Sequence, residues 1–67
     1  MTADIKVKAM QLGIHNLTEN LAEVTGKSIG SISHKMSGKT PWSADEIKAV
    51  ARAWDLTPIE VFQLFIN

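Results

Sequence analysis

The segment between Glu23 and Asp45 contains no Asp or Glu, although it carries three lysines and a histidine, Lys27, His34, Lys35 and Lys39. The rest of its middle part is rich in serine and glycine, which are small enough to let a backbone approach a partner closely. Cations and hydroxyl groups both hydrogen-bond phosphate oxygens, and no carboxylate is present to repel them. The segment is therefore suited to contact a polyanion, and the most plausible polyanion is nucleic acid.

The elements that position this segment follow from apolar spacing and from capping residues. A first helix is predicted over Thr2–Leu12, with Gly13 beyond it as a left-handed stop. A second helix begins at Asn16, which has a glutamate three residues later as in a capping box, or at Thr18. It ends at Gly26 or one residue before it. The turn that follows leads directly into the carboxylate-free segment.

Three further helices complete the expected domain. Ser28 caps a third helix that ends at Gly38. Ser43 and Glu46 form a capping box for a fourth, whose apolar residues keep helical spacing. Thr57 caps a fifth, which starts with a proline and runs to the end of the chain. No segment alternates in the manner of a strand, so the predicted class is an all-α, compact five-helix domain.

Size and composition restrict the possible functions. The chain has 67 residues, no cysteine and a formal net charge of zero. So small a domain buries only about 60% of its unfolded surface, and without a disulfide its stability depends on helix packing or on a second copy. Zero net charge argues against indiscriminate coating of nucleic acid. No apolar run is long enough to span a bilayer and no secretion signal begins the chain, so we expect no membrane partner and a cytoplasmic location.

Catalysis finds no support in the sequence. No serine stands in a nucleophile elbow, and neither Gly-Lys-Ser nor Gly-Lys-Thr has the upstream glycines of a nucleotide-binding loop. With His15 and His34 as the only histidines and no cysteine, a metal site is not expected. We expect no enzyme activity, no cofactor and no small-molecule substrate.

The spacing of five residues resembles a known family. Leu21 and Ala22 precede Gly26, which is followed by Ile32 six positions later and by Gly38 twelve positions later. This pattern is similar to the lambda-repressor-like, or Cro and repressor type, helix-turn-helix family. In that family's arrangement the small alanine lies where two helices cross, the first glycine takes the turn, and the isoleucine packs the third helix onto the core.

Two downstream stretches add to the likeness, and two features depart from it. Residues 37–43 and 56–62 are similar to short regulators of actinobacterial phages. Lys27 stands where the family usually has an apolar residue, and the approach to the second helix is one residue shorter than is common. The likeness covers nearly the whole chain.

The resemblance implies one helix-turn-helix domain over residues 1–67, with the motif at about 17–37 and a recognition helix at 28–37. It implies a sequence-specific regulator of transcription that binds double-stranded operator DNA, and a chain without a second domain favours a Cro-like repressor. In the family's binding mode the recognition helix enters the major groove. The residues thereby placed near bases are Ser28, Ile29, Gly30, Ser33 and His34.

Helical geometry gives an independent assignment of the outward face. With Ile32 as the inward direction and 100° per residue, Gly30, Ser33, His34 and Ser37 fall on the opposite half. Ile29 lies only about 60° from Ile32. Core packing and contact with a thymine methyl group are therefore equally consistent with its position.

The remaining polar residues of the segment and its neighbourhood are candidates to hold phosphates. Lysines act as flexible point charges, and hydroxyl groups donate hydrogen bonds to phosphate oxygens. The candidate phosphate contacts are Lys27, Lys35, Lys39, Thr18, Ser31, Ser37 and Thr40.

The last helix offers more apolar surface than a small core readily covers. Phe62, Phe65 and Ile66 either form a symmetric contact with a second copy or finish the core of the monomer. Trp54 continues the apolar stripe of the fourth helix, and Trp42 is expected to close the preceding loop against that helix. A protein-interaction module such as an antitoxin or antirepressor, docking through the last helix, is the alternative to a DNA-binding regulator.

Overall fold

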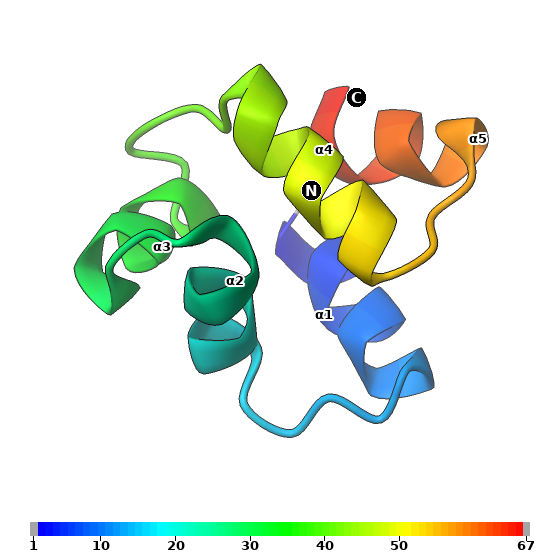
Figure 1. The fold of residues 1–67 in the computed structure, drawn as a ribbon, viewed down its shortest axis with the longest axis horizontal. Coiled ribbons are helices and arrows are strands. Elements are labelled where there is room, and N and C mark those ends of the chain that lie inside the picture. Colours follow the sequence, from blue (N-terminus) through cyan, green and yellow to red (C-terminus); the bar gives the residue numbers. More distant parts are fainter. Residues whose placement is uncertain (1, 67) are drawn as a thin grey trace.

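Five α-helices followed by one π-helical segment build the described part of the chain (Figure 1). The structure is a computed structural model that describes residues 2–66, with side chains from Asp4 onward. The elements are α1 (Thr2–Gln11), α2 (Leu17–Thr25), α3 (Ile29–Met36), α4 (Ala44–Ala53), α5 (Pro58–Val61) and η1 (Phe62–Ile66). Residues 2–66 contain no strand, which confirms the predicted all-helical class. No helix in this range is long and apolar enough to cross a membrane.

Side-chain caps begin four helices at predicted residues. Asn16 Oδ1 and the hydroxyl groups of Ser28, Ser43 and Thr57 each accept the N–H three residues ahead, at 3.1 to 3.3 Å. At Ser43 and Thr57 the capping box is complete, because the glutamate three residues on also accepts the N–H of the cap. Asn16, rather than Thr18, is thus the cap of α2. These bonds satisfy donors that a helix start otherwise leaves unpaired.

The core lies where α1, α2, α3 and α4 meet. Each contributes one side chain that is essentially closed to solvent, respectively Ile5, Leu21, Ile32 and Val50. Removing a side chain of this size from water stabilises the fold by about 1.5 to 3 kcal/mol. The central position of Ile32 holds the inner side of α3 against the other helices, which determines the face that α3 presents outward.

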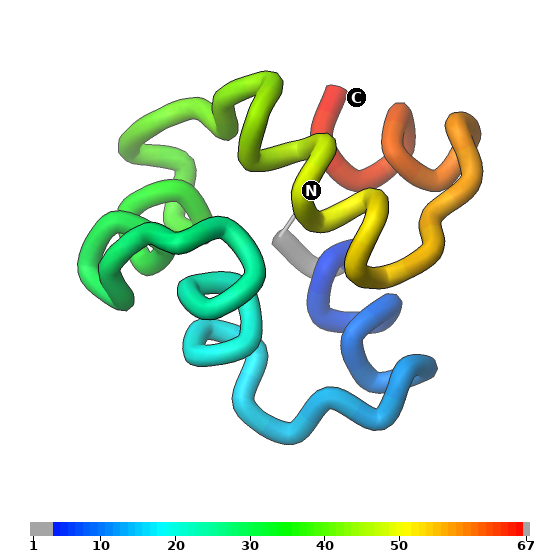
Figure 2. Tube along the Cα trace, viewed as in Figure 1, coloured from blue at the N-terminus to red at the C-terminus, as the bar shows by residue number. Residues whose placement is uncertain are grey.

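A second set of contacts ties α4 to α2. Trp54 is buried, as predicted, and its Nε1–H donates to Asn20 Oδ1 at 2.9 Å. The indole therefore combines apolar packing with a satisfied polar group, as a buried tryptophan requires. Figure 2 shows the chain continuing from α2 through α3 and the segment 37–43 into α4. The helices α2 and α3 pack against each other, and α2 also packs against α4.

The last helix differs from the expected single continuous α-helix. After α5 the chain changes to the wider π-helix η1 up to Ile66, and Asn67 lies outside the described residues. Phe65, one of the predicted dimer contacts, is only 7% exposed, and its ring meets that of Trp42 at 5.4 Å between centroids and 75° between planes. Phe65 is therefore corrected to a core residue. Trp42 thus packs on η1.

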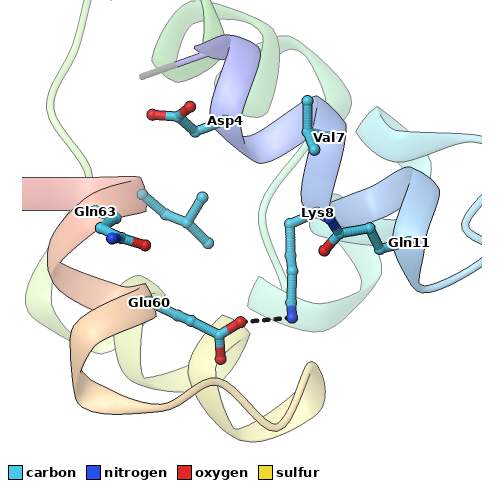
Figure 3. Close-up of a pocket in the computed structure, with 7 residues that line it drawn as sticks. Asp4, Val7, Lys8, Gln11, Glu60 and Gln63 are labelled. Carbon is cyan, nitrogen blue, oxygen red and sulfur yellow. Dashed lines mark hydrogen bonds and ion pairs between the residues drawn. The ribbon is translucent and has the colours of Figure 1, made fainter.

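The first helix packs against this C-terminal element. Lys8 Nζ lies 2.6 Å from Glu60 Oε2, beside a hollow of about 450 Å³ that Asp4, Val7 and Gln63 also line (Figure 3). The predicted end of the first helix shifts slightly, from Leu12 to Gln11. The ion pair links α1 to α5.

The two surfaces singled out in the sequence lie far apart. In Figure 1, which has the longest axis horizontal, α3 is at the left of the molecule and α5 at the right. The three principal extents are 27, 23 and 20 Å. A partner bound at α5 would therefore leave the outer face of α3 accessible.

Candidate nucleic-acid interface

The exposed face of α3 is made of small or uncharged side chains. Along the helix, burial follows the helical period: Ile32 is buried, and its flanking residues at 31, 35 and 36 are half-buried. The exposed residues are Ile29, Gly30, Ser33, His34 and Ser37. The predicted outward orientation of Gly30, Ser33, His34 and Ser37 is confirmed. For Ile29 the structure excludes core packing, because the side chain is 53% exposed.

The start of α3 presents backbone donors together with its cap. Ser28 Oγ accepts the Ser31 N–H at 3.1 Å, and the Ser28 carbonyl oxygen accepts the Ile32 N–H at 3.0 Å. The N–H groups of Ile29 and Gly30 precede the first intrahelical bond, so the helix itself supplies no acceptor for them. Such donors, with the helix dipole behind them, attract an anion.

The turn from α2 to α3 depends on Gly26. Its φ of +72° is a left-handed conformation that side chains rarely adopt, and its N–H donates to the Ala22 carbonyl oxygen at 2.9 Å. A Cβ at this position would meet nothing within 4 Å, so conformation rather than crowding requires the glycine. The next residue, Lys27, is exposed.

At Gly30, unlike at Gly26, the backbone conformation does not require a glycine. It lies within α3 with no positive φ, and an added Cβ would again meet no atom within 4 Å. Glycine inside a helix costs about 1 kcal/mol relative to alanine. Nothing in the packing of the described residues requires a glycine here, which is consistent with close approach of a partner and equally with simple tolerance of glycine in a short helix.

Lys35 requires the main correction among the predicted phosphate contacts. Its side chain is only 12% exposed, and its Nζ lies 3.3 Å from Glu46 Oε1 and donates to the Pro41 carbonyl oxygen at 3.3 Å. The ammonium group therefore ties α3 to the start of α4 and to the loop between them. We replace the predicted phosphate contact at Lys35 with this internal function.

The partner carboxylate, Glu46, is buried and charged. Burial alone would raise its pKa, but hydrogen bonds from the backbone and hydroxyl of Ser43 and from Lys35 outweigh burial and hold the pKa below 4.5. Lys35 thus pairs with a buried carboxylate at the start of α4. The capping box in the sequence predicts that the carboxylate of Glu46 lies at the start of α4. No signal in the sequence predicts its contact with Lys35.

Two exposed lysines remain at the ends of α3. Lys27 precedes the helix, and Lys39 follows it, with its N–H donating to the His34 carbonyl oxygen at 2.9 Å across the left-handed Gly38. Thr40, next to Lys39, is also exposed. The helix is thereby flanked at both ends by cations with access to solvent.

The other predicted hydroxyl donors are less accessible. Thr18 and Ser31 are half-buried, and the exposed Ser37 hydroxyl donates to the His34 carbonyl oxygen at 3.0 Å. A phosphate contact from Ser37 would have to exchange this bond for another. The exposed residues from Lys27 to Thr40 therefore include no carboxylate and have a lysine near each end of α3, and they can donate hydrogen bonds to anionic oxygens and to base edges.

Comparisons with protein-family models, with curated proteins and with solved structures gave no match for this chain. The case for its function therefore depends on the residues and geometry described above.

Proposed function

We propose that this chain is a sequence-specific regulator of transcription that binds double-stranded DNA. It uses α2 and α3 as a lambda-repressor-like helix-turn-helix and occupies an operator in the manner of a Cro-like repressor. The observation that carries the proposal is the exposed face of α3, which lacks carboxylates and has the accessible cations Lys27 and Lys39 at its ends. An ordinary surface helix mixes charges of both signs.

The dimensions of α3 suit a major groove. An α-helix with its side chains is about 10 to 12 Å across, and the major groove of B-form DNA is about 12 Å wide. Gly30 and Ser33 add little bulk to its outer face, so the backbone can come close to the base edges. Ser33 and His34 then read donors and acceptors of the bases, and Lys27 and Lys39 hold phosphates on either side.

A second copy of the chain completes the proposed regulator. Ile59, Phe62 and Ile66 are exposed on α5 and η1 at spacings of three and four residues, and none is charged, so two such faces meet without like-charge repulsion. Because α5 lies away from α3 (Figure 1), this contact leaves both reading helices free. A symmetric dimer binds half-sites one helical turn apart, about 34 Å, or a multiple of it.

The same apolar face favours a second candidate, a protein-interaction module such as an antitoxin or antirepressor. In that case Ile59 and Phe62 would contact an unlike partner, and α3 would be an ordinary solvated helix. The two candidates differ in their response to salt, because only phosphate contacts release counterions from DNA.

The test is a titration of fluorescent duplex DNA with the full chain at several salt concentrations. Two or three phosphate contacts per copy predict an affinity loss of about 10- to 40-fold between 50 and 200 mM salt. Selection from a random DNA pool then gives the preferred site. His34→Ala should change the ranking of sites, whereas Lys27→Ala should weaken all sequences alike. A DNA affinity that does not change with salt would contradict the proposed phosphate contacts, and the absence of any binding to duplex DNA would refute DNA binding and favour the interaction module.

A further inference from the structure

Ile29 is the one large apolar side chain on the outer face of α3. It is the first residue of the helix and is 53% exposed, although its angular distance from Ile32 also allowed a place in the core. Its neighbour on the helix surface is Ser33, four residues further along, and the adjacent Gly30 and the nearby His34 are also exposed. The isoleucine therefore projects beside small and polar groups.

Single exposed apolar residues are common and need no explanation by themselves. Two features distinguish Ile29. It adjoins Gly30, where neither the backbone φ nor the packing of neighbouring atoms requires a glycine. The backbone at this point is therefore open to close approach. In addition, a β-branched side chain is stiff at χ1 and loses little conformational freedom when a partner covers it.

The chemistry of the major groove limits what such a side chain can recognise. Base edges there present hydrogen-bond donors and acceptors, and the one apolar group is the 5-methyl group of thymine. Contact between this methyl group and an exposed aliphatic side chain removes apolar surface of both from water. An isoleucine next to a glycine has the reach and the clearance for this contact.

We propose that Ile29 reads the 5-methyl group of a pyrimidine, which is thymine in unmodified DNA. The inference rests on the proposed function and extends it, because it names one base that the operator must contain in each half-site. Ser33 and His34 supply hydrogen bonds, and Ile29 supplies the apolar discrimination that hydrogen bonds cannot give.

The experiment uses the full chain and the site selected from random DNA. Each thymine is replaced in turn by deoxyuridine, which lacks only the methyl group, and affinity is measured by fluorescence anisotropy. At one thymine per half-site the wild type should lose about fourfold in affinity, the value expected for one buried methyl group. Replacing that thymine by cytosine should weaken binding, and 5-methylcytosine should recover part of the loss.

Variants assign the effect to the residue. Ile29→Ala should bind the thymine site more weakly and no longer distinguish thymine from uracil at that position, and Ile29→Val should keep the distinction. Ser33→Ala is the matched control on the same face and should also keep it. Thermal unfolding followed by circular dichroism checks that each variant is folded.

The outcomes separate the inference from the proposed function. If the wild type selects a site yet tolerates deoxyuridine at every thymine, Ile29 does not read a methyl group, although DNA binding stands. The same conclusion follows if Ile29→Ala still discriminates against deoxyuridine. If no sequence is selected and affinity does not depend on salt, both are overturned.

Discussion

The ammonium group of Lys35 lies 3.3 Å from the buried carboxylate of Glu46 and joins the inner side of α3 to the first turn of α4. Glu46 at the same time completes the capping box of α4 by accepting the Ser43 N–H at 2.8 Å. One side chain thus determines where α4 begins and holds α3 in place. The position of the outer face of α3 depends on this link.

Removing the charge of Glu46 should destabilise the fold. Glu46→Gln weakens two charge-assisted hydrogen bonds and should lower the free energy of unfolding by about 1 to 3 kcal/mol. Asp45→Asn, at the exposed neighbouring position, should change it by less than about 0.5 kcal/mol. Urea unfolding measures both, and equal effects would show that the link contributes nothing.

Substitutions at Lys35 and Lys39 should distinguish a contribution to the stability of the fold from a contribution to DNA binding. Lys39→Ala should reduce the magnitude of the slope of log affinity against log salt by about 1 and leave the unfolding free energy unchanged. Lys35→Met keeps the aliphatic stem and should destabilise the protein without changing the slope. Lys6→Ala on α1 is the control for an exposed cation elsewhere. The assignment is wrong if Lys35→Met changes the slope and Lys39→Ala does not.

Gly30→Ala should make the protein more stable and a poorer DNA binder. Alanine has the higher helix propensity, and the position has room for a methyl group, so unfolding should cost up to about 1 kcal/mol more. Binding should weaken because the methyl group stands between backbone and DNA. Gly26→Ala is the contrasting control and should destabilise, since its φ is +72°. Unchanged DNA affinity of Gly30→Ala would remove the close-approach argument.

Acid should weaken the link between α1 and α5. The pKa of Glu60 is lowered from 4.5 to about 2, first by the hydrogen bond from Lys8 and then by the Thr57 N–H. Because the folded-state pKa is the lower one, this contribution to stability is complete above about pH 4.5 and is lost as the pH falls through about 2.

Glu60→Gln removes the contribution of Glu60 to stability. Glu46, whose pKa is also lowered, loses its own contribution in acid, but it does so equally in the wild type and in the variant. The variant should be less stable than wild type at neutral pH, and the difference should vanish near pH 2. Urea midpoints across this range measure it, with Glu23→Gln on α2 as the control. A difference that is independent of pH would contradict the assignment.

The two phenylalanines of η1 should behave differently. Phe62 is 57% exposed, so Phe62→Ser should reduce self-association in sedimentation and leave monomer stability nearly unchanged. Phe65→Ala should instead destabilise by about 3 kcal/mol or more, because the ring is buried against Trp42. If Phe62→Ser leaves self-association and cooperative DNA binding unaltered, the apolar face of α5 and η1 is not the dimer contact.

Local signals were sufficient to predict most of the fold. Asn16, Ser28, Ser43 and Thr57 cap helices where the sequence placed their starts, because a cap depends on residues only three positions apart. The outward face of α3 followed in the same way, since one inward residue, Ile32, determines the orientation of a short helix.

Features that depend on tertiary contacts or on unusual backbone could not be predicted in this way. Asp55, which follows the C-cap of α4, has a φ of +53° without being a glycine, so the usual glycine signal for a helix end is missing here. The burial of Phe65 and the pairing of Lys35 with Glu46 join residues distant in sequence, and the spacing within one helix carries no information about them. The change to η1 likewise has no local signal.

The central claim is that the outer face of α3 contacts DNA, and placing one carboxylate on that face tests it most directly. Ser33→Glu puts a negative charge at an exposed position and should weaken DNA binding at least about tenfold through repulsion from phosphates. Met10→Glu adds the same residue at an exposed position of α1 and should leave binding nearly unchanged. If both variants fold and Ser33→Glu binds DNA as tightly as Met10→Glu, α3 is not the binding surface.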